Sequence, residues 1–382
     1  MIDSPSSGKV RVLVAGGGVA ALEGALALRE LAPDRVEVTL LARATEYVVR
    51  PMAVREPFAY PLASRYDIDT VIGAGITHVA DDLEFVDSAA RTVATRGGRS
   101  LPYDALLIAV GARPAVRYAH AITMDDRKLD SLLHGMIQDI EGDYIRRVAF
   151  VAPERAGWPL PLYELALLTS RRAWSMGIAL ETIVVTPEDR PLQLFGSAVS
   201  HGVADLLHAA NIDVYTSAQS DVPQRREIVI HPGERRLQVD RVVALPELLG
   251  PAVVGLPQDE LGFLPIDAFG QVRDCGPVYA AGDATDFPVK HGGIAAQMAV
   301  TAARAIAAAA GADVERKPLD PVLRGILLTG AEPRYLSAHR MGGHAFDSTF
   351  TAEPTWDHPS KIATDYLGPR LTQIESTAKH AA

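Results

Sequence analysis

The first thirty residues contain the feature that most constrains the fold, an apolar run followed by three glycines and an alanine-rich segment. Residues 10–15 are the kind of apolar run that fills the middle of a parallel sheet. Residues 19–31 have the alanine and leucine content and the spacing of a packed helix. Between them, Gly16, Gly18 and Ala21 form the pattern G-x-G-x-x-A. The stretch therefore predicts a strand, a tight turn and a helix.

These three small residues indicate a place for a dinucleotide. Gly16 permits the tight turn, Gly18 lets a pyrophosphate approach the backbone, and Ala21 lets the helix lie close to the strand. The N-terminus of the helix offers unpaired N–H groups and a positive dipole end to the phosphates. Glycine-rich turns also occur where nothing binds, but this one follows a buried strand and opens a helix, which favours dinucleotide binding.

The next predicted strand, residues 35–41, lacks one expected side chain. In a site of this kind, an acidic residue near the end of that strand holds the adenosine ribose. Ala42 occupies that position and Arg43 follows it, while Glu46 lies too far along the chain to replace the carboxylate. Two interpretations stay open: Arg43 contacts the adenine or a phosphate, or this ribose is held less tightly.

The composition excludes several classes of function. The 382 residues, 48% hydrophobic and 22% charged, are those of a globular protein of two or three domains. The net charge of −10 argues against binding to nucleic acid. The single cysteine, Cys275, excludes an intrachain disulfide and a paired-thiol redox centre. The scattered histidines lack ligand spacing, so no metal site is expected.

No segment of the chain has the pattern of a secretory signal or a membrane span. The N-terminus lacks a basic region followed by an apolar stretch and a cleavage site, so a cytoplasmic location is expected. The most apolar segment, residues 292–312, is alanine-rich and interrupted by Gln297 and Arg304. These polar residues favour a core helix over a membrane span.

The remaining strands and helices indicate two related domains. Residues 75–86 are predicted as a strand followed by a hairpin, and residues 103–111 as another buried strand. A second alternation of strands and helices then follows, over residues 147–152, 162–174, 181–186, 196–210 and 212–215. A late apolar strand at 278–283 suggests that the chain returns to the first sheet.

We therefore predict an α/β fold of two Rossmann-like domains, the second inserted in the first, with a C-terminal tail. The expected boundaries are 1–115 and 251–312 for the split domain, 116–250 for the inserted one and 313–382 for the tail. For the tail, packing on the body of the chain or across a homodimer is favoured over contact with a membrane surface, because charged residues interrupt its weakly amphipathic segment, residues 356–371.

The inserted domain lacks a second glycine motif. At the turn where a nucleotide would bind, residues 153–159 read PERAGWP, with Trp158 in place of small residues. Proline removes N–H groups that a phosphate needs. We therefore expect that this domain does not bind NAD(P)H in the usual way.

Three motifs in this order resemble the two-dinucleotide-domain flavoproteins of the pyridine nucleotide-disulfide oxidoreductase superfamily. They are AGGGVAALEGALAL at the start, AVGARP at 109–114 and VYAAGDAT at 278–285. The segments PERAGWPLPLYELALL and DFPVKHGGIAAQ are most similar to the sulfide:quinone oxidoreductase-like branch, and type II NADH dehydrogenases are a more distant match. The resemblance covers residues 9–312 and implies bound FAD.

The resemblance also implies which residues would hold FAD. The pyrophosphate would meet Gly16, Gly18 and the amides of Val19 and Ala20, with Arg43 beside the adenosine and Leu83 beside the adenine. The strand end that passes under the cofactor would be Ala109, Val110 and Gly111. The ribityl chain and phosphate would meet Gly282 and Asp283, and the flavin ring the helix start at Gly293 and Ile294, with a positive charge added by Lys290.

Two departures from the family change the expected chemistry. A sulfide:quinone oxidoreductase needs paired redox cysteines at the flavin, whereas Cys275 stands alone and is expected to be an inert buried thiol. The missing glycine motif likewise argues against NAD(P)H as the electron donor. No catalytic residue can be assigned, although His291 beside Lys290 is a candidate proton donor or an ordinary loop histidine.

The sequence therefore predicts an FAD-dependent oxidoreductase that passes electrons from an unidentified small-molecule donor to a quinone or another acceptor. One alternative is a sulfide:quinone oxidoreductase-like enzyme of sulfur metabolism, acting on external sulfur nucleophiles or on a persulfide of a partner. The other is a flavin-binding sensor or docking protein without turnover.

Overall fold

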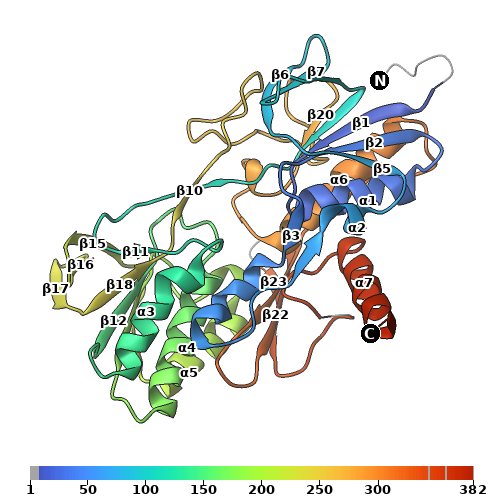
Figure 1. Cartoon of the computed structure of the whole chain (residues 1–382). Helices are drawn as coiled ribbons and strands as arrows, with labels where there is room; N and C mark the ends of the chain where they lie inside the picture. Colours follow the sequence, from blue (N-terminus) through green and yellow to red (C-terminus); the bar gives the residue numbers. More distant parts are fainter. Residues whose placement is uncertain (1–7, 343–344, 358, 382) are drawn as a thin grey trace.

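The computed structural model describes residues 8–342, 345–357 and 359–381. Its first domain is built on a sheet of five parallel strands in the order β20-β9-β1-β2-β5 (Figure 1). These strands are β1 (Val10–Ala15), β2 (Val36–Leu41), β5 (Ile76–Val79), β9 (Ala105–Ile108) and β20 (Val278–Ala280). Although β20 comes late in the chain, it pairs with β9. This return confirms the predicted split domain.

Two long helices pack against each other on this sheet. They are α1 (Val19–Leu31) and α6 (Gly292–Ala309). Gly24 of α1 allows this close packing, because a Cβ there would lie 2.7 Å from Cδ2 of Leu107 and 3.5 Å from Cβ of Ala299. Leu22 and Leu26 of α1 are at most 1% exposed, and burying each such side chain contributes about 1.5–3 kcal/mol.

Helix α6 is the predicted core helix. It is long and apolar enough to cross a membrane by length and composition alone, but 67% of it is buried inside the molecule. Its alanines leave room for close helix contacts, and Ala299, Ala302 and Ala303 are fully buried. Packing in the core therefore accounts for its hydropathy.

The inserted domain has a second parallel sheet of five strands, in the order β11-β18-β12-β13-β14. Its strands are β11 (Ile122–Thr123), β12 (Arg147–Val151), β13 (Glu181–Val185), β14 (Ile212–Tyr215) and β18 (Arg241–Ala244). Its helices are α3 (Leu129–Glu141), α4 (Leu160–Ser175) and α5 (Ser197–Ala209). The predicted alternation of strands and helices is therefore present, and the fold class is confirmed.

Alternate residues of the second sheet face different neighbours, as the two-residue period of a strand requires. In β12, Val148 and Phe150 belong to the main core. Ala149 and Val151 instead belong to a separate core with Ile228. That second core is closed by an antiparallel sheet of β15 (Gln219–Gln224), β16 (Glu227–His231) and β17 (Arg235–Gln238).

Besides β5 and β9, the elements between β2 and β11 are short. They are β3 (Glu46–Val48), the 3-10 helix η1 (Arg50–Phe58), β4 (Arg65–Asp67), α2 (Ile68–Ile72), β6 (Leu83–Asp87), β7 (Thr92–Thr95), β8 (Ser100–Pro102) and β10 (Arg113–Ala115). The hairpin predicted around Gly97 is the β7–β8 turn. Strand β10 pairs with β19 (Glu247–Leu249), and two 3-10 turns lie at Gln193–Phe195 (η2) and Gly282–Ala284 (η3).

The single strand expected over residues 75–86 is wrong, because the chain forms two strands, β5 and β6, with a bend between them. The carboxylate of Asp81 makes the bend. It accepts hydrogen bonds from the amide of Asp82 at 2.8 Å, the amide of Gly97 at 3.1 Å and Oγ1 of Thr95 at 2.7 Å. These side-chain bonds replace the ladder that a continuous strand would have formed.

The tail packs on the body of the same chain. It forms an antiparallel sheet of β21 (Val322–Leu327), β22 (Arg334–Gly342) and β23 (Ala345–Thr351), followed by α7 (Leu367–Ala381). Strand β23 contacts α5 of the inserted domain, whereas β21 contacts α6 and α7 contacts α1 of the first domain. The tail therefore joins the two domains, while the expected domain boundaries stay predictions.

Two buried carboxylates attach the tail. Glu23 of α1 accepts hydrogen bonds from the amides of Asp365 at 2.7 Å, Tyr366 at 3.1 Å and Leu367 at 2.7 Å, so it caps the start of α7. Burial raises the pKa of Glu23, and the three amides oppose that rise. Glu164 of α4 pairs with Lys361, whose side chains are 2% and 4% exposed.

Breaking the Glu164–Lys361 pair tests how firmly the tail is held. We expect Lys361→Met to lower the free energy of unfolding by about 3–5 kcal/mol, because it leaves a buried carboxylate without its cation. Urea unfolding followed by circular dichroism measures this loss. Adding Glu164→Gln should restore part of it, since glutamine can still accept the bond from the amide of Leu328.

The matched control is Lys317→Met, which removes a lysine from an exposed pair with Glu315. It should change the free energy of unfolding by less than about 0.5 kcal/mol. Equal effects of the two lysine substitutions would show that the buried pair does not hold the tail.

Candidate functional site

The glycine turn after β1 presses against the end of β9. Gly16 has φ +133°, and a Cβ there would lie 2.2 Å from the carbonyl oxygen of Ala109. A Cβ on Gly17 would lie 3.2 Å from Cβ of Ala42, at the end of β2. Three strand ends therefore meet at this turn, and only glycine permits the approach at Gly16.

The next glycine, by contrast, faces open space. Gly18 is the N-cap of α1 with φ −92°, and a Cβ there would meet nothing within 4 Å among the described atoms. No side chain caps the start of α1, so its first amides, which include those of Val19 and Ala20, are left without a side-chain acceptor. An open surface at uncapped helix amides suits an anionic group.

Residues from the far end of the sequence complete this edge of the sheet. Gly282 follows β20 and has φ +72°, and a Cβ there would lie 3.0 Å from Cβ of Ala295 and 3.3 Å from Cβ of Ala20. It therefore lies between the starts of α1 and α6. The predicted residues Gly16, Ala20, Ala109 and Gly282 are thus brought together.

Asp283 lies next to this contact and has an unused acceptor. Its side chain is partly exposed, and none of the residues that the structure describes donates a hydrogen bond to it. Burial raises its pKa to about 6, an effect that Lys290 opposes and Asp126 strengthens. A half-buried carboxylate without a donor suits a ligand with hydroxyl groups.

Lys290 is buried near Asp283 but is already engaged by the protein. Its Nζ donates a hydrogen bond to the carbonyl oxygen of Thr285 and lies 3.9 Å from the centroid of the Phe263 ring. Burial lowers its pKa to about 8, while nearby carboxylates, Asp283 first among them, raise it. The predicted cation is therefore present beside Asp283, held by a backbone carbonyl and an aromatic ring.

His291 caps helix α6. Its Nδ1 accepts a hydrogen bond from the amide of Ile294 at 3.4 Å, and its ring centroid lies 4.3 Å from that of Trp158. Burial, followed by the charge of Lys361, lowers its pKa to about 3, so the ring is neutral at neutral pH. The neutral ring therefore cannot act as an imidazolium proton donor. The N–H of Ile294 is already directed at this ring.

The remaining predicted residues lie around this edge. Val110 is 37% exposed, and a Cβ on Gly111 would meet nothing within 4 Å among the described atoms. Arg43 is paired with Asp82 at 3.2 Å, and Leu83 begins β6 beside that pair. Gly293 lies under the tail, where a Cβ on it would be 3.7 Å from the carbonyl oxygen of Ala363.

Sequence reasoning missed the contacts that close the head of α6. Ile362 lies 3.2 Å from where a Cβ on Gly292 would be, and Trp158 stacks on His291. Neither contact has a local pattern, because the partners lie 70 and more residues apart. The one available signal was the histidine directly before Gly292-Gly293, in the N-cap position.

The turn of the inserted domain fills the space beside Lys290. The amide of Lys290 donates a hydrogen bond to the carbonyl oxygen of Gly157 at 3.3 Å, and a Cβ on Gly157 would lie 2.9 Å from Cγ of Lys290. Because Trp158 also covers His291, protein atoms occupy the surface of this turn that faces the first domain.

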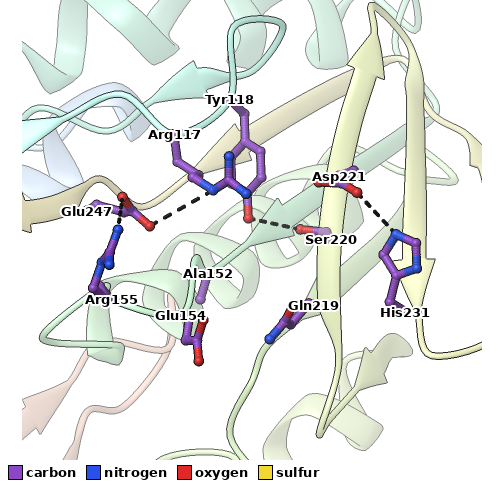
Figure 2. A pocket seen from close by; sticks show the side chains of 10 residues that line it. All are labelled: Arg117, Tyr118, Ala152, Glu154, Arg155, Gln219, Ser220, Asp221, His231 and Glu247. Atoms are coloured by element: carbon purple, nitrogen blue, oxygen red, sulfur yellow. Dashed lines mark hydrogen bonds and ion pairs between the residues drawn. The ribbon is translucent and has the colours of Figure 1, made fainter.

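A small polar pocket lies at the carboxyl ends of the second sheet (Figure 2). The pocket has a volume of about 270 Å³. Within it, Glu247 forms ion pairs with two arginines, with Arg155 at 3.2 Å and with Arg117 at 3.9 Å. Glu154 and Asp221 also line it. The negative charges of these carboxylates would repel the phosphates of a nucleotide.

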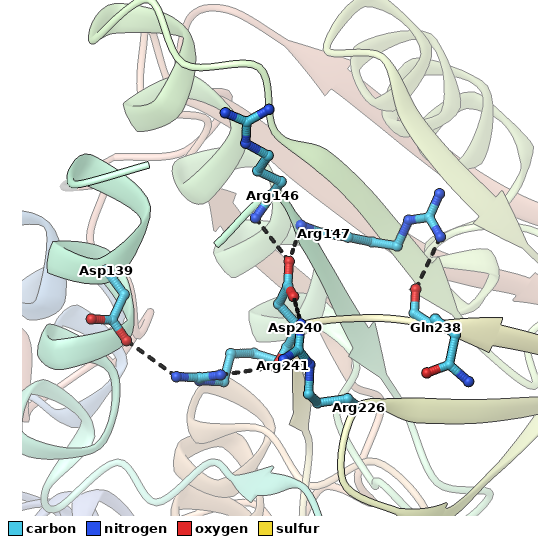
Figure 3. A network of polar contacts seen from close by, with 7 residues as sticks. All are labelled: Asp139, Arg146, Arg147, Arg226, Gln238, Asp240 and Arg241. Carbon is cyan, nitrogen blue, oxygen red and sulfur yellow. Dashed lines mark hydrogen bonds and ion pairs between the residues drawn. The ribbon is translucent and has the colours of Figure 1, made fainter. Parts of the chain in front are cut away.

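The opposite edge of the same sheet carries a paired charge network (Figure 3). Asp240 accepts hydrogen bonds from the amides of Arg146 at 2.9 Å and Arg147 at 3.0 Å, and it pairs with Arg226. Arg241 pairs with Asp139 of α3 at 3.2 Å. These contacts join the starts of β12 and β18 to their neighbours and are structural.

Cys275 is 8% exposed, and burial raises the pKa of its thiol. A thiol that is buried and protonated is a poor nucleophile.

Several solved structures of other proteins superpose on this chain and share its overall fold. The sulfide:quinone oxidoreductase of Aquifex aeolicus superposes with a TM-score of 0.82 at 17% identity, over 97% of this chain and 90% of that one. The ferredoxin reductase for the CYP199A2 system from Rhodopseudomonas palustris gives 0.66 at 17% identity, over 90% and 88% of the two chains. An NAD-dependent persulfide reductase from A. fulgidus gives 0.61 at 17% identity, over 87% and 64%.

The sequence comparison identifies the family. No curated protein matches the chain. The model of the family described as pyridine nucleotide-disulphide oxidoreductase, however, matches residues 3–130 and 164–308, well over half of the chain. The gap in this match contains the turn at 153–159, which lacks the second glycine motif. The chain therefore belongs to the pyridine nucleotide-disulphide oxidoreductase family.

Proposed function

We propose that this chain is an FAD-dependent oxidoreductase that passes electrons from a small-molecule donor other than NAD(P)H to a quinone or another acceptor. The observation that carries the proposal is the convergence of Gly16, Gly18, Gly282 and Asp283 with the start of α6 at one edge of the first sheet. These residues come from opposite ends of the sequence. Their meeting has the character of a dinucleotide site rather than of a tight turn alone.

The residues at this edge fit FAD. The uncapped amides of α1 and the open surface at Gly18 would hold the pyrophosphate. Asp283 would accept hydrogen bonds from the ribityl hydroxyls, since no described residue occupies its carboxylate. The bound flavin ring would supply the electron-accepting group, and the protein would supply its position and surroundings.

The donor proposal rests on the inserted domain. Trp158 and Gly157 pack on His291 and Lys290, so protein atoms fill the surface that faces the first domain. Two prolines flank that turn, and Glu154 follows β12. These features disfavour the phosphates of NAD(P)H.

A second candidate is oxidation of a sulfur compound, which the similarity to the sulfide:quinone oxidoreductase of Aquifex aeolicus favours. Cys275 is the only cysteine and is buried, so no pair of cysteines within this chain can carry the sulfur. The sulfur nucleophile or persulfide would then come from outside the chain.

The test begins with the visible spectrum of the purified protein. We expect the absorption bands of an oxidised flavin, and the released cofactor should be FAD by chromatography. NADH, NADPH and sulfide are then added separately under anaerobic conditions, with dithionite as the control that the flavin is reducible. Bleaching by either pyridine nucleotide would contradict the donor proposal, whereas bleaching by sulfide alone would favour the second candidate. A protein that cannot be reconstituted with flavin would contradict the central proposal.

Two glycines give a matched pair for the FAD site. Gly18→Ala should leave the stability of the flavin-free protein within about 0.5 kcal/mol, because the Cβ meets open space. It should weaken FAD binding at least about tenfold by blocking the approach to the helix amides. Calorimetry of the flavin-free protein and a flavin-fluorescence titration measure the two effects.

Gly16→Ala is the comparison, with the opposite expectation. Its Cβ would lie 2.2 Å from the carbonyl oxygen of Ala109, so it should destabilise even the flavin-free protein by about 1–3 kcal/mol. If Gly18→Ala bound FAD like the wild type, the turn would not be the pyrophosphate site.

Asp283 should make FAD binding depend on pH. Its pKa of about 6 in the flavin-free protein should fall on binding, because hydroxyl donors favour the carboxylate. Affinity should therefore rise with pH up to about 6, by at most about tenfold per unit, and level off above it. Titrations across that range measure the slope, which should vanish in Asp283→Asn. An unchanged slope in the variant would assign it to another group.

A further inference from the structure

Strand β2 ends without the carboxylate that commonly holds an adenosine ribose. Ala42 occupies that position and is 3% exposed, and its Cβ lies 3.2 Å from where a Cβ on Gly17 would be. The end of β2 is therefore in the right place, beside the glycine turn. What it lacks is a hydrogen-bond acceptor for the sugar or the base.

The neighbouring strand brings two carboxylates to the same edge. Strand β5 runs parallel to β2 with Leu41 opposite Val79, and after Ala80 the chain continues with Asp81 and Asp82. Asp81 is occupied by its three hydrogen bonds within the bend, which include those from Thr95 and Gly97. Asp81 is therefore a structural residue.

Asp82 differs from Asp81, because its carboxylate has acceptor capacity left. Its Oδ2 lies 3.2 Å from Nη1 of Arg43, and its side chain is 30% exposed. Among the described residues, no other group donates to this carboxylate. The guanidinium of Arg43, whose side chain is 76% exposed, thus forms an ion pair with this carboxylate beside the end of β2 and leaves lone pairs open.

We propose that Asp82, paired with Arg43, supplies the acceptor for the adenosine half of FAD that β2 lacks. The inference rests on the proposed function and adds a specificity residue to that site. The ribose hydroxyls and the adenine amino group are all donors, which a carboxylate can accept. Arg43 compensates the negative charge of Asp82 near the anionic pyrophosphate.

Charge alone predicts the opposite result for a substitution at this position. FAD carries negative phosphates, so removing a nearby carboxylate should strengthen binding if Asp82 acts only through its charge. If Asp82 accepts hydrogen bonds from the adenosine, Asp82→Asn should weaken binding instead. The direction of the change therefore separates the two roles.

The experiment titrates the flavin-free protein with FAD and, separately, with FMN, which lacks the adenosine. Asp82→Asn should weaken FAD binding about 10- to 100-fold, the range for losing a hydrogen bond to a charged group. FMN binding and the melting temperature of the flavin-free protein should stay unchanged. The matched control is Glu84→Gln, which removes an exposed carboxylate two residues away and should leave FAD binding unchanged or slightly stronger.

Two results would overturn the inference. One is FAD binding in Asp82→Asn that is as tight as in the wild type or tighter. The other is an equal loss of FAD and FMN binding, which would indicate a general structural role. A wild-type chain that binds neither flavin would contradict the proposed function itself, and this result is seen before any variant is compared.

Discussion

The close approach of the glycine turn to β9 is the constraint on which the site depends. A side chain at Gly16 would overlap the carbonyl oxygen of Ala109, so the backbone of the turn lies directly on the neighbouring strand. This contact fixes where α1 begins and which way its first amides point. A small displacement of the turn would move the helix start away from Gly282 and Asp283.

The split of the first domain supplies the other half of that constraint. Because β20 pairs with β9 on the far side from β1, the segment after β20 reaches the same edge as the glycine turn. Gly282 then contacts Ala20 across more than 260 positions of the sequence. The inserted domain must therefore leave its two junctions close together, and the antiparallel pairing of β10 with β19 joins them there.

Local patterns were sufficient to predict most of the fold. The strand–turn–helix at the start, the second alternation and the late return at 278–283 each follow from apolar periodicity and small residues. Contacts between distant side chains were not predictable in this way. The stacking of Trp158 on His291 and the bend made by Asp81 depend on partners that no local period reveals. The antiparallel sheet of the tail was also missed, since glycine and charged residues interrupt the alternation of its strands.

The cap that Glu23 places on α7 has a consequence for synthesis of the chain. Glu23 is synthesised more than 340 residues before the amides that it accepts from, those of residues 365–367. Until those residues are synthesised, the carboxylate of Glu23 lacks these donors, and burying it without them would be costly. The part of α1 around Glu23 can therefore reach its final packing only after residues 365–367 have been synthesised.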